Sequence, residues 1–108
     1  MKGFSLKINL ENKIPLVYLN GDITSEAEHL LNDAYETIMK KSKSPTIIFD
    51  FSNAYYINSS GISAFIKLIH KHNDLNGNFI FTGLSDHLKK VIDIVGLTEY
   101  ITILDPAK

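Results

Sequence analysis

The chain changes its hydrophobic period several times, and this pattern limits the available folds more than any single motif does. Over residues 4–10, apolar and polar residues alternate, which is typical of a strand with one solvent-facing side. From residue 25, apolar residues recur three and four positions apart, which is the period of a helix. Both periods return further along the chain. The pattern therefore favours a sheet with helices packed on it.

The predicted elements follow in the order β-β-α-β-α-β-α-β. A polar turn at 11–13 makes the first two strands an antiparallel hairpin, and the later strands, separated by helices, should pair in parallel. We therefore predict an α/β fold, with one domain over residues 1–108 and helices packed on a mixed β-sheet. The predicted strands lie near 4–10, 14–19, 46–51, 79–81 and 100–104, and the predicted helices near 25–41, 59–75 and 86–95.

Local details make this prediction more specific. Ser25 and Glu28 have the spacing of a capping box, which predicts the start of the first helix. The strand at 46–51 is an almost unbroken apolar run, which is typical of a strand covered on both faces. Ser85 or Asp86 can cap the third helix. Its inner face is predicted to run from Leu88 to Val95, with Gly96 as its C-terminal cap.

Composition argues against several classes of function. The net charge is −1, from 11 basic and 12 acidic residues, so no overall field attracts nucleic acid or an anionic membrane. There is no cysteine, which removes disulfides, thiol catalysis and cysteine-ligated metals. The N-terminus lacks a signal-peptide pattern, and no apolar run approaches the roughly 20 residues that cross a bilayer. We expect a cytoplasmic protein without direct membrane insertion, nucleic-acid partner or cofactor.

The chain has four histidines, which raises the question of a metal site. His70 and His72 lie two positions apart on a predicted helix and therefore point to different faces, so they should not ligate one ion together. We expect solvated surface histidines and no metal site.

The corner Asn58-Ser59-Ser60-Gly61, where a strand-like segment gives way to a helix, is the strongest functional candidate. Serine and asparagine there can cap the helix. The corner also matches the glycosylation sequon, which requires export. A hydrolytic serine needs a base within hydrogen-bond reach, and His70 and His72 lie about 15 Å further along the same predicted helix. His29 and His87 are expected near the starts of other helices, with no acid placed to orient them. The fourth alternative is a phosphorylated serine, whose added charge the helix N-terminus tolerates. A partner docked over the corner would then meet a buried dianion, so phosphorylation should change binding more than shape.

Three stretches together resemble the anti-sigma factor antagonists, which carry a STAS (sulphate transporter and anti-sigma antagonist) domain. Gly21-Asp22-Ile23 is similar to the family's "GEID"-like element, and Ile57–Ile62 is similar to its D-S-[ST]-G-[LI] signature. The segment Phe79–Leu97 resembles the family's C-terminal third. The resemblance covers nearly the whole chain and implies the same fold.

The resemblance implies a partner-switching regulator and not an enzyme. In this family, the unphosphorylated antagonist binds an anti-sigma factor that is itself a serine kinase, and so frees a sigma factor for transcription. The kinase phosphorylates the first serine of the signature, which corresponds to Ser59, and this ends the interaction until a serine phosphatase restores it. The alternative is a STAS subunit of a membrane transporter or signalling assembly that is not phosphorylated. The exposed first strand leaves a monomer or a weak homodimer open.

The predicted partner-binding face surrounds Ser59. Its residues are Asp22, Thr24, Tyr56, Asn58, Ser60, Gly61 and Ile62. Two positions depart from the family pattern, because Asn58 stands where the family usually has aspartate and Thr24 where an acidic residue is common. Both departures make the corner less acidic.

Overall fold

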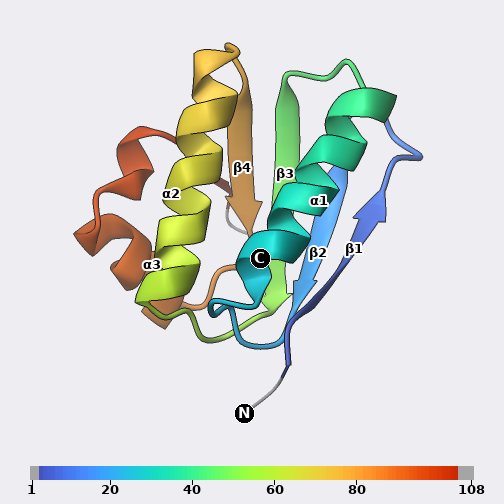
Figure 1. Ribbon diagram of the computed structural model, residues 1–108. Helices are drawn as coiled ribbons and strands as arrows, with labels where there is room; N and C mark the ends of the chain where they lie inside the picture. Colours follow the sequence, from blue (N-terminus) through green and yellow to red (C-terminus); the bar gives the residue numbers. More distant parts are fainter. Residues whose placement is uncertain (1–2, 105–108) are drawn as a thin grey trace.

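Five strands form one sheet, and their order across the sheet is their order along the chain. A computed structural model describes residues 3–104 (Figure 1). The first two strands pair antiparallel and the remaining neighbours pair parallel, which confirms the predicted mixed α/β fold and element order. The elements are β1 (Ser5–Asn9), β2 (Leu16–Asn20), α1 (Ala27–Lys41), β3 (Thr46–Asn53), α2 (Ser59–Asp74), β4 (Asn78–Thr82), α3 (Asp86–Ile94), the 3-10 helix η1 (Leu97–Glu99) and β5 (Thr102–Leu104).

The helices α1 and α2 lie over one face of the sheet, and the core fills the space between them and the strands (Figure 1). Side chains of β3 alternate accordingly: Ile47, Phe49 and Phe51 are buried. Ile48 and Asp50 point the other way and are half-buried. The expectation that this strand is covered on both faces is therefore wrong. An apolar residue such as Ile48 is shielded partly by its neighbours in the sheet, so the apolar run does not require a second layer.

Phenylalanine rings form the centre of the core. The ring of Phe49 on β3 contacts Phe65 of α2 and Phe79 and Phe81 of β4, with centroid separations of 5.5, 4.9 and 5.9 Å. These contacts are close to edge-on, and such pairs add about 0.5–1.5 kcal/mol each beyond the burial of their area. They hold α2 over β3 and β4, and this positions the N-terminus of α2 at the end of the sheet where β3 ends.

The helix α1 begins later than predicted and without a capping box. Its first residue is Ala27, and the preceding Glu26 makes no side-chain capping bond. The N–H of Ala27 donates to the Thr24 carbonyl oxygen at 2.9 Å instead. The Glu28 carboxylate accepts from Lys67 Nζ of α2 at 3.2 Å and so does not reach back to Ser25. The capping-box prediction is wrong because the Glu28 carboxylate forms an ion pair with Lys67 of α2 instead.

The limits of α3 agree with the prediction. The Ser85 hydroxyl oxygen accepts from the Leu88 N–H at 3.2 Å and caps the helix. Gly96 follows the C-terminus in the left-handed region with φ of 81°, which suits glycine. Leu88 and Ile92 are buried, but Val95 is 41% exposed and is not part of the inner face.

One histidine is buried, contrary to expectation. His72, near the end of α2, is 2% exposed, whereas His29, His70 and His87 lie on the surface as predicted. Its Nε2 lies 2.8 Å from the Pro45 carbonyl oxygen and its Nδ1 lies 2.8 Å from the Tyr35 hydroxyl. A carbonyl oxygen only accepts, so Nε2 carries the proton and Nδ1 accepts from Tyr35. The neutral ring is therefore satisfied at both nitrogens.

Candidate functional site

Two connections, β2–α1 and β3–α2, lie side by side because backbone hydrogen bonds join them. Ile23 contributes two: its N–H donates to the Tyr56 carbonyl oxygen at 2.9 Å, and its carbonyl oxygen accepts from the Asn58 N–H at 3.1 Å. The N–H of Gly21 donates to the Asn53 carbonyl oxygen at 3.0 Å. The two connections thus form one backbone-bonded corner, in which neither can move far without the other.

Apolar side chains anchor this corner in the core. Ile23 is fully buried and pairs in a parallel bridge with Ile57, which is 7% exposed. The residues next to these anchors are consequently held at the surface of the same edge. Asp22 and Thr24 are half-buried, and Tyr56 is 46% exposed.

Asn58 caps α2. Its Oδ1 accepts from the Gly61 N–H at 2.9 Å, and its backbone carbonyl oxygen accepts from the Ile62 N–H at 2.9 Å. The backbone of Asn58 is extended, as a capping residue requires. The capping interpretation is therefore confirmed for Asn58, and this leaves the two serines without a capping role.

Ser59 and Ser60 are the first two residues of α2, and both are exposed. Within the described residues, neither side-chain hydroxyl has a hydrogen-bond partner. Ser59 therefore presents a free hydroxyl at a helix N-terminus, three residues after the exposed Tyr56.

Gly61 shapes the corner from a buried position. A Cβ atom at this position would overlap the Ile23 carbonyl. Glycine thus allows the first turn of α2 to lie against the β2–α1 connection. It supports the predicted binding face without contributing a side chain to it.

Within residues 3–104, the hydroxyls of Ser59 and Ser60 have no histidine or carboxylate hydrogen-bond partner, and His87, on the first turn of α3, is exposed. His29 pairs with Asp33 at 3.1 Å, His70 contacts the Tyr100 ring, and His72 is held by Tyr35. Among the described residues, no group of three or more histidine, cysteine or acidic side chains is placed to hold a metal ion.

The structure brings all eight predicted residues to one edge of the sheet, where β2 and β3 end and α2 begins. Ile62 is half-buried, so part of its apolar side chain remains accessible. Two exposed residues beside this set were not predicted: Tyr55, at 62% exposure, and Ser63, one turn further along α2. The pair Tyr55-Tyr56 just before the corner was the available signal for the first.

Residues 5–106 match the model of the STAS domain family. The chain belongs to this family. Among solved structures, this STAS domain is similar to the anti-sigma factor antagonist SpoIIAA in its unphosphorylated form, with 16% identity and a TM-score of 0.73 over 95% of this chain and 90% of that chain. It is also similar to the Bacillus cell fate determinant SpoIIAA in the phosphorylated form, with 18% identity and a TM-score of 0.72 over 96% and 93% of the two chains.

An anti-sigma factor antagonist from Mycobacterium paratuberculosis is similar as well, at 16% identity and a TM-score of 0.78, over 97% of this chain and 87% of that chain. At these identities the likeness shows the fold alone. No curated protein matches the sequence. Within residues 3–104, no helix has the length and apolar character needed to span a membrane.

Proposed function

We propose that this STAS domain is an anti-sigma factor antagonist, released from an anti-sigma factor with serine kinase activity when Ser59 is phosphorylated. The observation that carries the proposal is the exposed, unpartnered Ser59 hydroxyl at the first position of α2, on a corner held by backbone hydrogen bonds. The similarity to SpoIIAA structures in unphosphorylated and phosphorylated forms supports it.

In the proposed reaction, Ser59 Oγ attacks the γ-phosphorus of ATP bound to the kinase. The Oγ–P bond forms, the bond to the β-phosphate oxygen breaks, ADP leaves, and the hydroxyl proton passes to a base of the kinase. The antagonist is the substrate and a ligand in this scheme and not the enzyme. A serine phosphatase reverses the change by hydrolysis, and all three proteins act in the cytoplasm.

The fold should tolerate the phosphoryl group. Asn58 accepts from the N–H groups of Gly61 and Ile62, which leaves those of Ser59 and Ser60 available to phosphoryl oxygens. The positive end of the helix dipole also favours an anion at this position. Phosphorylation therefore need not unfold α2.

The docked complex, in contrast, should not tolerate it. The proposed docking face places Tyr56 and Ile62 beside Ser59, with Asp22, Thr24, Asn58 and Ser60 around them and Gly61 beneath. A partner that covers these apolar groups would also cover a phosphate of about −1.5 to −2 charges. A buried charge without a partner is strongly unfavourable, so the complex dissociates.

The direct test is incubation with a cognate kinase and ATP, followed by mass spectrometry. We expect one phosphate on Ser59, none on Ser59→Ala, and normal phosphorylation of Ser60→Ala as the neighbouring control. A kinase that is active on another substrate and leaves Ser59 unmodified would contradict the proposal.

Binding of the anti-sigma factor provides a second test. Ser59→Asp should weaken it by at least about 1.4 kcal/mol, a factor of ten, while Ser59→Ala stays near wild type. Asn32→Asp adds the same charge to the exposed surface of α1 and is the matched control, which should leave the affinity unchanged.

The neutral Asn58 and Thr24 favour one alternative, a STAS subunit of a membrane transporter or signalling assembly that is not phosphorylated. In that case, affinity for a transporter ATPase would be the same for wild type, Ser59→Ala and Ser59→Asp. Such constancy, together with no binding to an anti-sigma factor, would replace the first proposal with the second.

A further inference from the structure

The face of the sheet that points away from α1 and α2 is not covered by any helix that the structure describes, and we call it the open face (Figure 1). Strand register arranges its side chains in rows that run across the strands. One row is Lys7, Tyr18, Asp50, Thr82 and Leu104, and the next is Asn9, Leu16, Ile48, Ile80 and Thr102.

Apolar side chains occupy the middle of the open face. Leu16, Ile48 and Ile80 are adjacent on β2, β3 and β4, and all three are half-buried. Tyr18 in the neighbouring row is 41% exposed, and Leu104 at the end of that row is 49% exposed. Leu16, Tyr18, Ile48 and Ile80 are neighbours in this register, and a contiguous apolar surface is typical of an interaction site.

The two rows contain only two charged side chains, and their signs are opposite. Lys7 and Asp50 flank Tyr18, each one strand away, or about 4.8 Å across the sheet. Among the described residues, neither takes part in an ion pair. The Asp50 carboxylate accepts one hydrogen bond, from the Ser52 N–H at 2.8 Å, and its second oxygen remains available.

We propose that the open face binds the open face of a second copy of this chain. A two-fold axis that lies between the facing sheets and runs along β2 reverses the order of strands in the copy. Lys7 of each copy then faces Asp50 of the other, and Leu16 and Tyr18 meet their own equivalents near the axis. An axis along β3 would instead place Asp50 of one copy opposite Asp50 of the other. Charge complementarity therefore favours the axis along β2.

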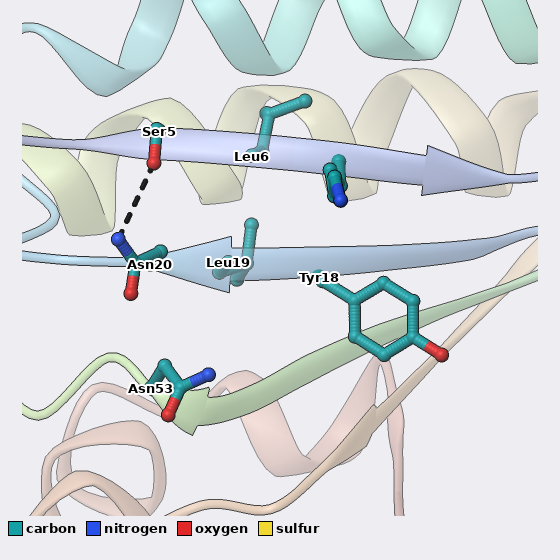
Figure 2. Close-up of a pocket in the computed structure, with 7 residues that line it drawn as sticks. Ser5, Leu6, Tyr18, Leu19, Asn20 and Asn53 are labelled. Atoms are coloured by element: carbon teal, nitrogen blue, oxygen red, sulfur yellow. Dashed lines mark hydrogen bonds between the residues drawn. The ribbon is translucent and has the colours of Figure 1, made fainter.

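The shape of the open face fits this arrangement. A hollow of about 500 Å³ lies beside Tyr18, and its lining includes Lys7, Asn20 and Asn53 (Figure 2). It is large enough for an aromatic ring, so the Tyr18 ring of the facing copy has a place beside the first. Facing sheets pack about 10 Å apart, a spacing at which such side chains interdigitate.

The contact has a modest size. Five short strands at about 4.8 Å spacing cover less than the roughly 800 Å² per partner of a standard stable interface. We therefore expect a weak dimer whose population rises with concentration. Its face does not include the Ser59 corner, so the inference holds whether or not Ser59 is phosphorylated.

Sedimentation velocity over micromolar to near-millimolar concentrations tests the dimer. Wild type should shift from monomer toward dimer as concentration rises. Lys7→Glu sets Glu against Asp50 at both contacts and should weaken association at least tenfold, and Asp50→Lys should do the same by setting lysine against lysine. Lys13→Glu, with the same charge change in the exposed β1–β2 turn, is the matched control and should associate like wild type.

The deciding experiment mixes the two weakened variants. Lys7→Glu and Asp50→Lys restore an opposite-charge pair at both contacts, so an equimolar mixture should form a heterodimer with affinity near that of wild type. If Asp50→Lys fails to fold, because it loses the bond to Ser52, the comparison of Lys7→Glu with Lys13→Glu still decides. A wild-type monomer at every concentration, or a dimer unaffected by Lys7→Glu, would overturn the proposal.

Discussion

Acidification should destabilise this protein through His72. The ring is buried between α1, α2 and β4, where it stacks on Phe79 with centroids 4.8 Å apart and meets the Tyr35 ring edge-on. Its two hydrogen bonds, to Tyr35 and to the Pro45 carbonyl, are both satisfied in the neutral form. Among residues 3–104, no carboxylate forms an ion pair with the ring, and Glu36 and Lys71, the sequence neighbours of Tyr35 and His72, pair with each other at 3.1 Å.

Burial lowers the pKa of His72 below its usual value of 6.5, and the hydrogen bond to the Pro45 carbonyl opposes part of this shift. Below pH 6.5 the unfolded chain therefore takes up a proton that the folded chain refuses, so stability falls as pH falls. Above that pH the imidazole is neutral in both states and contributes no slope. The loss is at most about 1.4 kcal/mol between about pH 7.5 and about pH 5.5.

Urea unfolding followed by circular dichroism at these two pH values measures the effect. Other groups also titrate, so the quantity to compare is the loss of unfolding free energy from about pH 7.5 to about pH 5.5 in wild type minus the same loss in His72→Gln. We expect a positive difference of up to about 1.4 kcal/mol. His70→Gln is the matched control, because His70 is exposed on the same helix. At neutral pH, His72→Gln should itself lose about 1–3 kcal/mol, since Gln cannot satisfy both buried partners.

One experimental outcome would refute the role of His72 in the pH dependence of stability. If His72→Gln and wild type lose the same unfolding free energy on acidification, His72 does not couple folding to pH. Nitrogen chemical shifts in NMR spectra provide an independent check, because they should show the proton on Nε2 at neutral pH. A protonated Nδ1 with an unprotonated Nε2 would refute the assigned hydrogen bonds.

Two further perturbations test the construction of the corner. Asn58→Ala removes the cap of α2 and should lower the unfolding free energy by about 1 kcal/mol in urea titrations. Asn58→Asp should keep the cap, so equal losses in the two variants would contradict the capping role. Gly61→Ala should destabilise the protein by about 1–3 kcal/mol despite the better helix propensity of alanine, because its Cβ would overlap the Ile23 carbonyl. Its thermal unfolding midpoint should be lower than that of Gly3→Ala, where no atom lies near the added Cβ.

The sequence was sufficient for the element order, the opening hairpin and the location of the corner, because each depends on local period and turn chemistry. Two of its errors concern interactions between segments distant in sequence. The Glu28 carboxylate was assigned to its own helix, but it pairs with Lys67, 39 residues away. His72 lies on the apolar side of α2, four positions after Leu68 and three after Ile69, and this spacing was the signal that it is buried. The spacing does not identify the hydrogen-bond partners of the ring, because Tyr35 and Pro45 lie next to His72 only in the folded chain.

The two ends of α2 differ in their surroundings, and their separation makes the proposed regulatory role compatible with a stable fold. Ser59 begins the helix and His72 lies 13 residues later, about 20 Å away at 1.5 Å per residue. The N-terminal end carries exposed hydroxyls on a backbone-bonded corner, and the C-terminal end is fixed in the core by His72. Sites this far apart that share no partners should have additive effects on stability. Ser59→Asp and His72→Gln combined should therefore lose the sum of their separate unfolding free energies to within about 0.5 kcal/mol. A larger deviation would show that the N-terminus of α2 and the core are coupled, and that a charge at Ser59 alters the fold as well as the proposed docking surface.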